Sequence, residues 1–291
     1  MADLKTKYMG LELRSPIIAG SCGLTSDVNK MVEMEKAGVG AVVLKSIFEE
    51  QINEETSGVF KAGYGMGDAY PEAEDYIKAY IRSNTIQKYV ELVRNAKSRL
   101  TIPVIASVNC FSGGEWVSFA RQLEEAGADA LELNVFILPV NEFKESAEVE
   151  NVYFEIVKSI KSQIKIPVSV KISHYFTNLS AFVDKIKAYG ANATTLFNRF
   201  YEPDININTL EMGAASVFST AAELRTTLRW TGILAGKDKK LEISASTGVH
   251  GGEAAVKLLL AGATTVQVCS VLYEKGIHVI EDINNFIGKW M

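Results

Sequence analysis

Four segments of the sequence share one pattern, and this pattern decides the fold: KAGVGAVVLKS (36–46), EAGADALELN (125–134), AYGANATTLFN (188–198) and LAGATTVQVCS (260–270). Each contains a glycine that suits the C-terminal end of a helix, because glycine takes a left-handed backbone at low cost. An apolar strand follows, as expected for a sheet that is buried on both faces. Each strand then ends in a polar residue. This repeat predicts a parallel barrel that presents its chemistry at one rim.

Four further apolar segments alternate with these repeats: PIIAG (16–20), IPVIASV (102–108), IPVSVKI (166–172) and LEISAS (241–246). Together they make eight expected strands, separated by amphipathic stretches at 27–36, 85–100 and 115–125. Eight strands that alternate with helices favour a closed α/β structure, the (β/α)8 TIM barrel. We expect a single domain over residues 1–291, with long rim loops at 47–84 and 199–220.

The composition is that of an acidic globular enzyme, with 47% hydrophobic and 22% charged residues. The formal net charge of −5 argues against nucleic acid or an anionic membrane as the partner. The cysteines Cys22, Cys110 and Cys269 are far apart in the sequence and odd in number, which suits a reducing compartment and predicts no disulfide framework. The sequence shows no secretory signal pattern and no apolar run of membrane length, so we expect a cytoplasmic protein. The histidines lack metal-site spacing.

A phosphate site is predicted at the last two expected strands. Thr247, Gly248 and Val249 follow one strand, and Cys269 and Ser270 end the next. In many barrels of this kind, backbone N–H groups of these two loops hold a phosphate group. The glycines allow the main chain to approach the phosphate oxygens closely, and they are found at positions 248, 251 and 252. The alternative is that they only turn the chain.

Polar side chains on the other strand tips indicate a larger ligand. Lys45 and Lys171 lie in otherwise apolar strands. A buried lysine needs an anionic partner, because desolvation of its charge is costly. Either lysine alone could extend to solvent or pair with a carboxylate. Together with the three asparagines on the same rim, they favour a ligand with several carbonyl groups and ring nitrogens, such as a flavin: Asn109, Asn134 and Asn198.

Several segments resemble the class 1-type dihydroorotate dehydrogenases, which are FMN-dependent (β/α)8 enzymes of pyrimidine synthesis. The resemblance runs through nearly the whole chain, and it is carried by PIIAGS, VVLKS, ALELNV, PVSVKIS and STGVHGGEAAVKLLLAGATTVQVCSVL. It implies an oxidoreductase that binds FMN and acts on a small-molecule substrate. Dihydroorotate, or a related dihydropyrimidine, would be oxidised to orotate with hydride transfer to the flavin. A homodimer is implied as well.

The resemblance also assigns site residues. It implies that Lys45 lies near the flavin ring and that Lys171 faces its N1 and O2 atoms. Other flavin contacts are expected from Gly20, Ser21, Ser46, Asn109, Asn134 and Asn198. The phosphate contacts are expected from Gly248, Val249, Gly252, Cys269 and Ser270.

One expected residue is absent. In the family, the loop after the fourth strand carries a Cys or Ser base that removes the C5 proton of dihydroorotate. Here this loop reads NVFILPVNEF (134–143), and Phe136, Ile137 and Leu138 cannot accept a proton. We expect another base, and His174 is favoured because its unperturbed pKa suits the task; a structural loop histidine is the alternative. Other candidates are Tyr175, Glu142 and Tyr64.

The substrate contacts are expected from Asn198 and Arg199. Arg199 could hold a substrate carboxylate with two hydrogen bonds, or it could pair with Glu202 or Asp204. The loop after the second strand also departs from the family and reads GYGMGDAYPEAEDYI (63–77).

Three alternatives to dihydroorotate oxidation stay open at the sequence level. The first is a flavin oxidoreductase of the same fold with another substrate. The second is a non-catalytic or electron-transfer flavoprotein. The third is a flavin-free barrel that binds a phosphorylated ligand. An iron–sulfur/FAD partner subunit, as in class 1B enzymes, is possible on the sequence alone.

Overall fold

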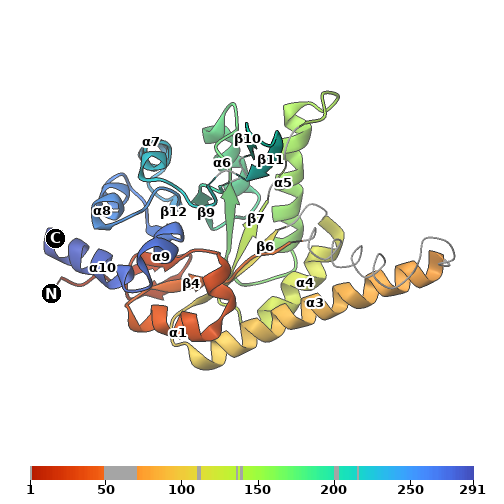
Figure 1. The fold of residues 1–291 in the computed structure, drawn as a ribbon, viewed down its shortest axis with the longest axis horizontal. Coiled ribbons are helices and arrows are strands. Elements are labelled where there is room, and N and C mark those ends of the chain that lie inside the picture. Colours follow the sequence, from red (N-terminus) through yellow and green to blue (C-terminus); the bar gives the residue numbers. More distant parts are fainter. Residues whose placement is uncertain are drawn as a thin grey trace.

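The computed structural model describes residues 2–48, 71–109, 113–135, 137, 140–199, 203–214 and 216–291. In this part of the chain, eight parallel strands pair in one closed ring, as the sequence predicted (Figure 1). They are β3 (Ile17–Ala19), β4 (Ala41–Val43), β6 (Val104–Asn109), β7 (Ala130–Asn134), β8 (Val168–Ile172), β9 (Ala193–Leu196), β12 (Glu242–Ala245) and β13 (Thr265–Val268). The pairing of β4 with both β3 and β6 closes the barrel.

Helices follow the strands and surround the barrel. They are α1 (Val28–Lys36), α3 (Pro71–Arg99), α4 (Gly113–Glu125), α5 (Ser146–Lys161), α6 (Leu179–Ala188), α7 (Leu224–Lys237), α8 (Gly252–Leu260), α9 (Ser270–Lys275) and α10 (Val279–Trp290). The three expected amphipathic stretches are confirmed as helices. Helix α3 begins earlier than expected, so the second half of the predicted 47–84 loop is partly helical. Pro71 suits a first helical position, where no backbone N–H is needed.

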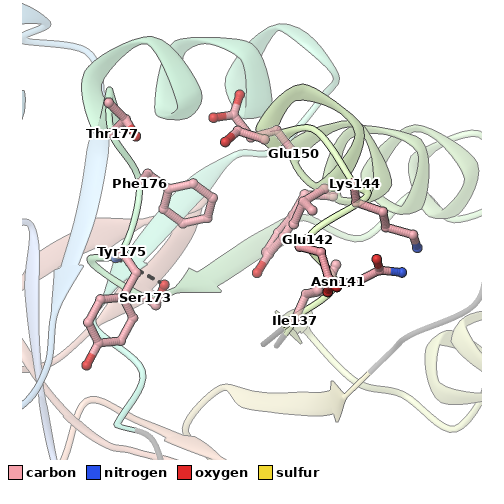
Figure 2. Close-up of a pocket in the computed structure, with 12 residues that line it drawn as sticks. Ile137, Asn141, Glu142, Lys144, Glu150, Ser173, Tyr175, Phe176 and Thr177 are labelled. Carbon is pink, nitrogen blue, oxygen red and sulfur yellow. Dashed lines mark hydrogen bonds between the residues drawn. The ribbon is translucent and has the colours of Figure 1, made fainter. Parts of the chain in front are cut away.

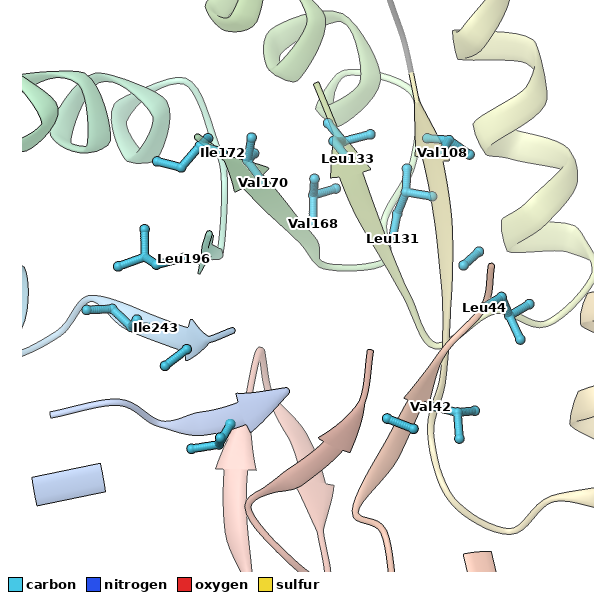
Figure 3. Close-up of a cluster of buried hydrophobic side chains, with 14 of the residues drawn as sticks. Val42, Leu44, Val108, Leu131, Leu133, Val168, Val170, Ile172, Leu196 and Ile243 are labelled. Carbon is cyan, nitrogen blue, oxygen red and sulfur yellow. The ribbon is translucent and has the colours of Figure 1, made fainter. Parts of the chain in front are cut away.

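The outward faces of the strands form the main apolar core. Figure 3 shows Val42, Leu131, Leu133, Val168 and Val170 among the buried side chains of this cluster. They alternate along each strand with residues that face the barrel axis, as the two-residue period of a strand requires. This core fixes the strands, and it therefore fixes the direction of every inward side chain.

An N-terminal hairpin closes one end of the barrel. Strands β1 (Thr6–Tyr8) and β2 (Leu11–Leu13) pair in antiparallel fashion through a two-residue turn at Met9 and Gly10, both with positive φ. Tyr8 is 1% exposed, and it packs with inward residues from the amino-terminal halves of the strands. This hairpin was not predicted, because Met-Gly lacks the Asn or Asp that usually marks such a turn.

The middle of the barrel holds a chain of hydrogen bonds. The Tyr8 hydroxyl donates to Ser169 Oγ at 3.3 Å, and Ser169 Oγ lies 2.9 Å from Thr195 Oγ1. Thr195 Oγ1 donates to Glu132 Oε2 at 3.0 Å, and Gln267 Nε2 donates to the same oxygen at 2.8 Å. All five side chains are buried. The barrel axis therefore changes from apolar at the hairpin to polar toward the carboxyl ends of the strands.

The segment after β9 also contains regular structure that we had expected to be a loop. Strands β10 (Pro203–Asn206) and β11 (Glu211–Ala214) form an exposed antiparallel hairpin. Short elements complete the described structure: β5 (Ile47–Phe48) and the 3₁₀ turns η1 (Gly23–Ser26) and η2 (Ala221–Glu223). Among the described helices, none combines the length and the hydropathy needed to cross a bilayer.

Candidate active site at the carboxyl ends of the strands

A cavity of about 550 Å³ opens at the carboxyl ends of β3, β8, β9, β12 and β13. This is the end of a parallel barrel at which active sites lie. The cavity brings together eight of the residues expected from the sequence: Ser21, Lys171, Asn198, Arg199, Gly248, Val249, Cys269 and Ser270.

Lys171 supplies a buried positive charge to this cavity. Its side chain is 8% exposed, and its Nζ atom lies 3.9 Å from Glu132 Oε1. This separation exceeds the 2.7–2.9 Å of a charge-assisted hydrogen bond, so the carboxylate balances the charge without satisfying the ammonium group's donors. Because Lys171 also lines the cavity, there is room for a second partner beside it.

Two buried amide groups at the barrel strands are incompletely paired, and one of them, Gln267, lines the cavity with Lys171. Asn109 Oδ1 and Gln267 Oε1 have no hydrogen-bond partner within the described residues. Unpaired buried polar atoms are costly, so they are candidates for ligand contacts. The asparagines at the ends of β7 and β9 are hydrogen-bonded to each other, since Asn198 Nδ2 donates to Asn134 Oδ1 at 2.7 Å.

A cluster of hydroxyl groups lies where the phosphate site was expected. Ser219 donates its backbone N–H to Ser270 Oγ at 2.9 Å, and its Oγ lies 3.1 Å from the same atom. Ser219 Oγ also lies 3.2 Å from His250 Nε2, and His250 Nδ1 lies 3.0 Å from Glu274 Oε2. Gly248 N–H donates to Ser219 Oγ at 3.4 Å. The hydrogen bonds that run from Glu274 through His250 therefore orient Ser219 in the cavity wall.

The glycines of this loop have different roles. Gly248 has a φ of +80°, and a Cβ there would lie 2.2 Å from the backbone N of Leu224. Glycine is therefore required by both the conformation and the close packing. A Cβ at Gly252 would lie 2.4 Å from Phe286 of α10. Gly252 does not line the cavity, so its place in the sequence is explained by helix packing.

Lys45 does not lie in the barrel interior, and the expectation of its burial is wrong. Its side chain is exposed and lines a shallow pocket against α3 with Lys88 and Leu92. Strand β4 ends at Val43, and the chain pairs again only at Ile47. Because of this break, the residues after Val43 no longer alternate between the inside and the outside of the barrel as the residues of β4 do. Ser46, rather than Lys45, therefore points toward the barrel interior.

Ser46 lies behind the cavity wall. Its Oγ atom lies 3.0 Å from Ser21 Oγ and 2.7 Å from Ser107 Oγ. Ser46 is buried, and Ser21 faces the cavity. Ser46 therefore positions Ser21, and its own contact with a flavin stays a prediction.

His174 lines a separate small cavity of about 80 Å³, together with Asn198 and Arg199. Its ring packs against Tyr175 and Phe197, with centroid distances of 4.2 Å and 5.7 Å. Partial burial lowers the pKa of His174 below its usual value. The imidazole is therefore neutral at neutral pH and able to accept a proton.

Arg199 is already paired within the protein. Its Nε donates to Glu223 Oε1 at 3.0 Å, and its Nη1 donates to the carbonyl oxygens of Ser216 and Val217. Glu223 is an ion-pair partner that the sequence did not suggest, because η2 brings it to the rim. Of the two partners that the sequence suggested, Glu202 lies outside the described residues.

Two other proton-acceptor candidates, Glu142 and Tyr175, do not line the cavity of about 550 Å³, and Tyr175 also lines the small cavity beside His174. Glu142 and Tyr175 line a different cavity of about 560 Å³, between the start of α5 and the loop after β8 (Figure 2). Its wall includes Tyr153, whose pKa is raised to about 12 by burial. Tyr64, Phe136 and Leu138 lie outside the described residues. In the described part of the chain, no three His, Cys, Asp or Glu side chains form a group suited to a metal ion.

Comparison with known proteins identifies the family. A family model described as "Dihydroorotate dehydrogenase" matches residues 3–291. The chain belongs to the dihydroorotate dehydrogenase family. It is 30% identical over 297 residues to the catalytic subunit of dihydroorotate dehydrogenase B (NAD(+)) from Thermoplasma acidophilum, covering 100% of this chain and 94% of the relative. It is 26% identical over 309 residues to a putative dihydroorotate dehydrogenase A (fumarate) from Aeropyrum pernix, covering 99% and 92%.

Several residues in and around the cavity of this dihydroorotate dehydrogenase-family chain were not found from the sequence. Glu132 carried a signal, because it is a charged residue within the apolar run ALELN. Ser219 carried none, since it lies in a polar loop and reaches the cavity only through the course of that loop. The pairing of His250 with Ser219 likewise depends on tertiary structure.

Proposed function

We propose that this chain is an FMN-dependent oxidoreductase that oxidises dihydroorotate or a closely related dihydropyrimidine. The observation that carries the proposal is the incompletely paired Lys171 ammonium in a cavity of about 550 Å³ at the carboxyl ends of the strands. The membership in the dihydroorotate dehydrogenase family supports the same reaction class.

The described residues fit the chemistry of FMN. The unpaired Asn109 Oδ1 and Gln267 Oε1 suit the polar edge of a flavin ring, since buried acceptors need N–H donors. The Ser219–Ser270 cluster at the start of α9 suits a phosphate group, because hydroxyl and backbone N–H groups there can donate to its oxygens. When bound, FMN would supply a hydride acceptor for the substrate.

In this proposal, Lys171 would hold the polar edge of the flavin and could stabilise negative charge there through its free donors. Glu132 holds the ammonium in place, and it is itself held by Thr195 and Gln267. The proposal rests on Lys171 more than on Lys45, since the Lys45 side chain is exposed.

We propose that His174 is the base that accepts the proton from substrate C5, because its imidazole is neutral and lies beside Asn198 and Arg199. Asn198 and Arg199 are proposed to contact the substrate. Arg199 would do so with an orientation set by Glu223.

The partner proposals follow from the relatives' names. Because the Thermoplasma relative is named as a catalytic subunit, we propose an electron-transfer partner protein for this chain. We further propose a homodimer and a cytoplasmic location. The net charge of −5 is compatible with both.

Anaerobic spectral titration tests the proposal directly. The purified protein is titrated with FMN, and then dihydroorotate is added without oxygen. We expect loss of the visible absorbance of the oxidised flavin, as hydride transfer to the flavin requires. Lys171→Ala should weaken FMN binding or slow the reduction, and His174→Gln should slow the reduction with little change in FMN affinity. Failure to bind FMN would refute the assignment of a flavin enzyme.

A second candidate is a flavin oxidoreductase of the same fold with a different substrate. The loop NVFILPVNEF favours it, because this loop lacks the Cys or Ser base expected from the family resemblance. FMN binding without bleaching by dihydroorotate, but with bleaching by another reduced ring, would select this candidate.

A further inference from the structure

Two cysteines that are far apart in the sequence meet in the wall of the cavity. Cys22 follows β3 and Cys269 follows β13, and these two strands pair in parallel. Both residues line the cavity, and both are free thiols. The Sγ atom of Cys269 lies 3.9 Å from the carbonyl oxygen of Ser21, which directly precedes Cys22.

Gly20 makes this approach possible. A Cβ atom at position 20 would lie only 2.5 Å from Cys269 Sγ. Any side chain there would displace the sulfur from the end of β3. The glycine therefore directs the Cys269 thiol toward the loop that carries Cys22.

The surroundings give the two thiols opposite character. The neighbouring Cys269 thiol is the main cause that lowers the pKa of Cys22 to about 6. The backbone N–H groups of Leu24 and Thr25 and the Tyr273 hydroxyl add to this shift, although burial opposes it. The neighbouring Cys22 thiol and burial raise the pKa of Cys269 well above its usual value. A thiolate thus lies beside a protonated thiol, as in pairs that form disulfides readily.

We propose that Cys22 and Cys269 form a peroxide-sensitive dithiol, in which Cys22 is oxidised first and Cys269 then closes a disulfide with it. The Cys22 thiolate attacks one oxygen of a hydroperoxide, and the O–O bond breaks. Cys22 becomes a sulfenic acid, while the leaving oxygen takes up a proton. The Cys269 thiol then loses its proton and attacks the Cys22 sulfur, so that water leaves.

This reaction balances with the peroxide as its only co-reactant. The two thiols lose two electrons and two protons, and hydrogen peroxide is reduced to two molecules of water. The product would link the loop after β3 to the loop after β13 across the wall of the cavity. The inference does not depend on the proposed function, because it concerns only the thiols of the chain.

Peptide mapping tests the proposal, and the cleavage sites of the chain make the test simple. Trypsin places each cysteine on its own peptide, namely 15–30 for Cys22, 100–121 for Cys110 and 258–275 for Cys269. The reduced, native protein is treated with hydrogen peroxide, its remaining thiols are alkylated, and it is digested without a reductant. We expect a cross-linked 15–30/258–275 species that dithiothreitol removes.

Matched variants separate the two roles. Cys110→Ser should cross-link like the wild type. Cys269→Ala should leave Cys22 as a sulfenic acid that dimedone traps, whereas Cys22→Ala should leave Cys269 reduced and open to alkylation only after unfolding. Recovery of peptides 15–30 and 258–275 unlinked after peroxide treatment, or linked to 100–121 instead, would overturn the proposal.

Alkylation at low pH gives an independent measurement. At pH 6, a thiol with a pKa of about 6 is half ionised, against roughly 0.3% of an ordinary cysteine. A thiolate with a lower pKa is also less nucleophilic, and this reduces its rate of alkylation by about 13-fold. The larger ionised fraction outweighs this loss, so Cys22 should react roughly 10-fold faster than a model thiol. The groups that face the pair are Tyr273 at Cys22, and Lys171 and Glu132 at Cys269. Cys269→Ala should raise the midpoint of this reaction, and an unchanged midpoint would contradict the thiol–thiol contact.

Discussion

The two ends of the barrel are built from the same strands but have opposite interiors. At the amino end, Tyr8 of the hairpin packs on Ile18, Ala41 and Ile105, with no buried charge in this described cluster. At the carboxyl end, inward positions of the same sheet hold Lys171 and Glu132. Tyr8, Glu132 and Lys171 are all buried, so burial alone does not separate structure from function.

The difference lies in which buried groups lack partners. The amino end is packed with apolar side chains around the Tyr8 hydroxyl, which donates to Ser169, and the groups left unpaired near it among the described residues are uncharged hydroxyls such as Ser244 Oγ. The carboxyl end contains acceptors without partners and an ammonium group 3.9 Å from its carboxylate. Incomplete pairing beside a cavity indicates a site that is completed by a ligand, and each prediction below tests one part of this contrast.

The largest effect is expected from Glu132→Ala. This change leaves the Lys171 ammonium buried without its carboxylate, and it removes the acceptor used by Thr195 and Gln267. Breaking a buried pair from one side costs about 3–5 kcal/mol of the free energy of unfolding. Urea unfolding followed by circular dichroism measures it.

The exposed pair Lys30–Glu33 provides the control, because both side chains are about half exposed. Glu33→Ala should cost less than about 1 kcal/mol. An equal decrease in the free energy of unfolding for Glu132→Ala and Glu33→Ala would show that the buried pair at the carboxyl end contributes no more than an exposed pair.

A smaller effect is expected from Ser219→Ala at the phosphate end of the cavity. The variant removes a hydroxyl group that His250 and Ser270 hold in the wall. If FMN binds as proposed, the loss of one hydrogen bond to a charged group weakens binding by about 10-fold or more. Fluorescence titration with FMN gives the dissociation constant. Thr209→Ala in the exposed hairpin turn is the control, and identical affinities for both variants would exclude Ser219 from the binding site.

Tyr8→Phe should have a modest effect at neutral pH and a distinctive effect at high pH. The lost hydrogen bond to Ser169 costs about 0.5–1.5 kcal/mol at pH 7. Burial raises the pKa of Tyr8 above its usual value, so the folded state keeps a proton that the unfolded state loses above about pH 10. Wild-type stability should therefore fall as the pH rises above 10.

The variant lacks this group, so its stability should fall less steeply between pH 9 and pH 11, as judged by urea unfolding at about 0.5-unit intervals. Some decline should persist, because burial also raises the pKa of Tyr89. Parallel curves for the wild type and the variant would show that Tyr8 is not buried as described.

The smallest effect is expected from Lys45→Met. Because this side chain is exposed, the free energy of unfolding should change by less than about 0.5 kcal/mol. Lys171→Met should change both the unfolding energy and FMN affinity by more. If Lys45→Met changed the unfolding energy or the FMN affinity more than Lys171→Met does, then Lys45 and not Lys171 would supply the positive charge of the site.

The sequence predicted the barrel well because its signals are local. A helix-ending glycine followed by an apolar strand recurs in the four repeats, and each strand lies where that pattern placed it. Gly248 and Ser270 were expected at the rim because they lie shortly after two strands, and both line the cavity, while their contact with a phosphate group stays a prediction.

Other features could not be found in this way. The orientation of Lys45 depends on a break between β4 and β5, and no residue type marks that break. The contact between Cys22 and Cys269 joins residues 247 positions apart through the β3–β13 pairing. The wide spacing that argued against a disulfide framework therefore says nothing about the proximity of two particular thiols.

The N-terminal hairpin has a consequence for the order of folding. Its residues leave the ribosome first, yet Tyr8 bonds to Ser169 and the Met9 backbone bonds to Glu242, far along the chain. Contacts of such large sequence separation form late. During synthesis the growing sheet therefore exposes the apolar surface that Tyr8 later covers, and this interval is when the nascent chain is most prone to aggregate.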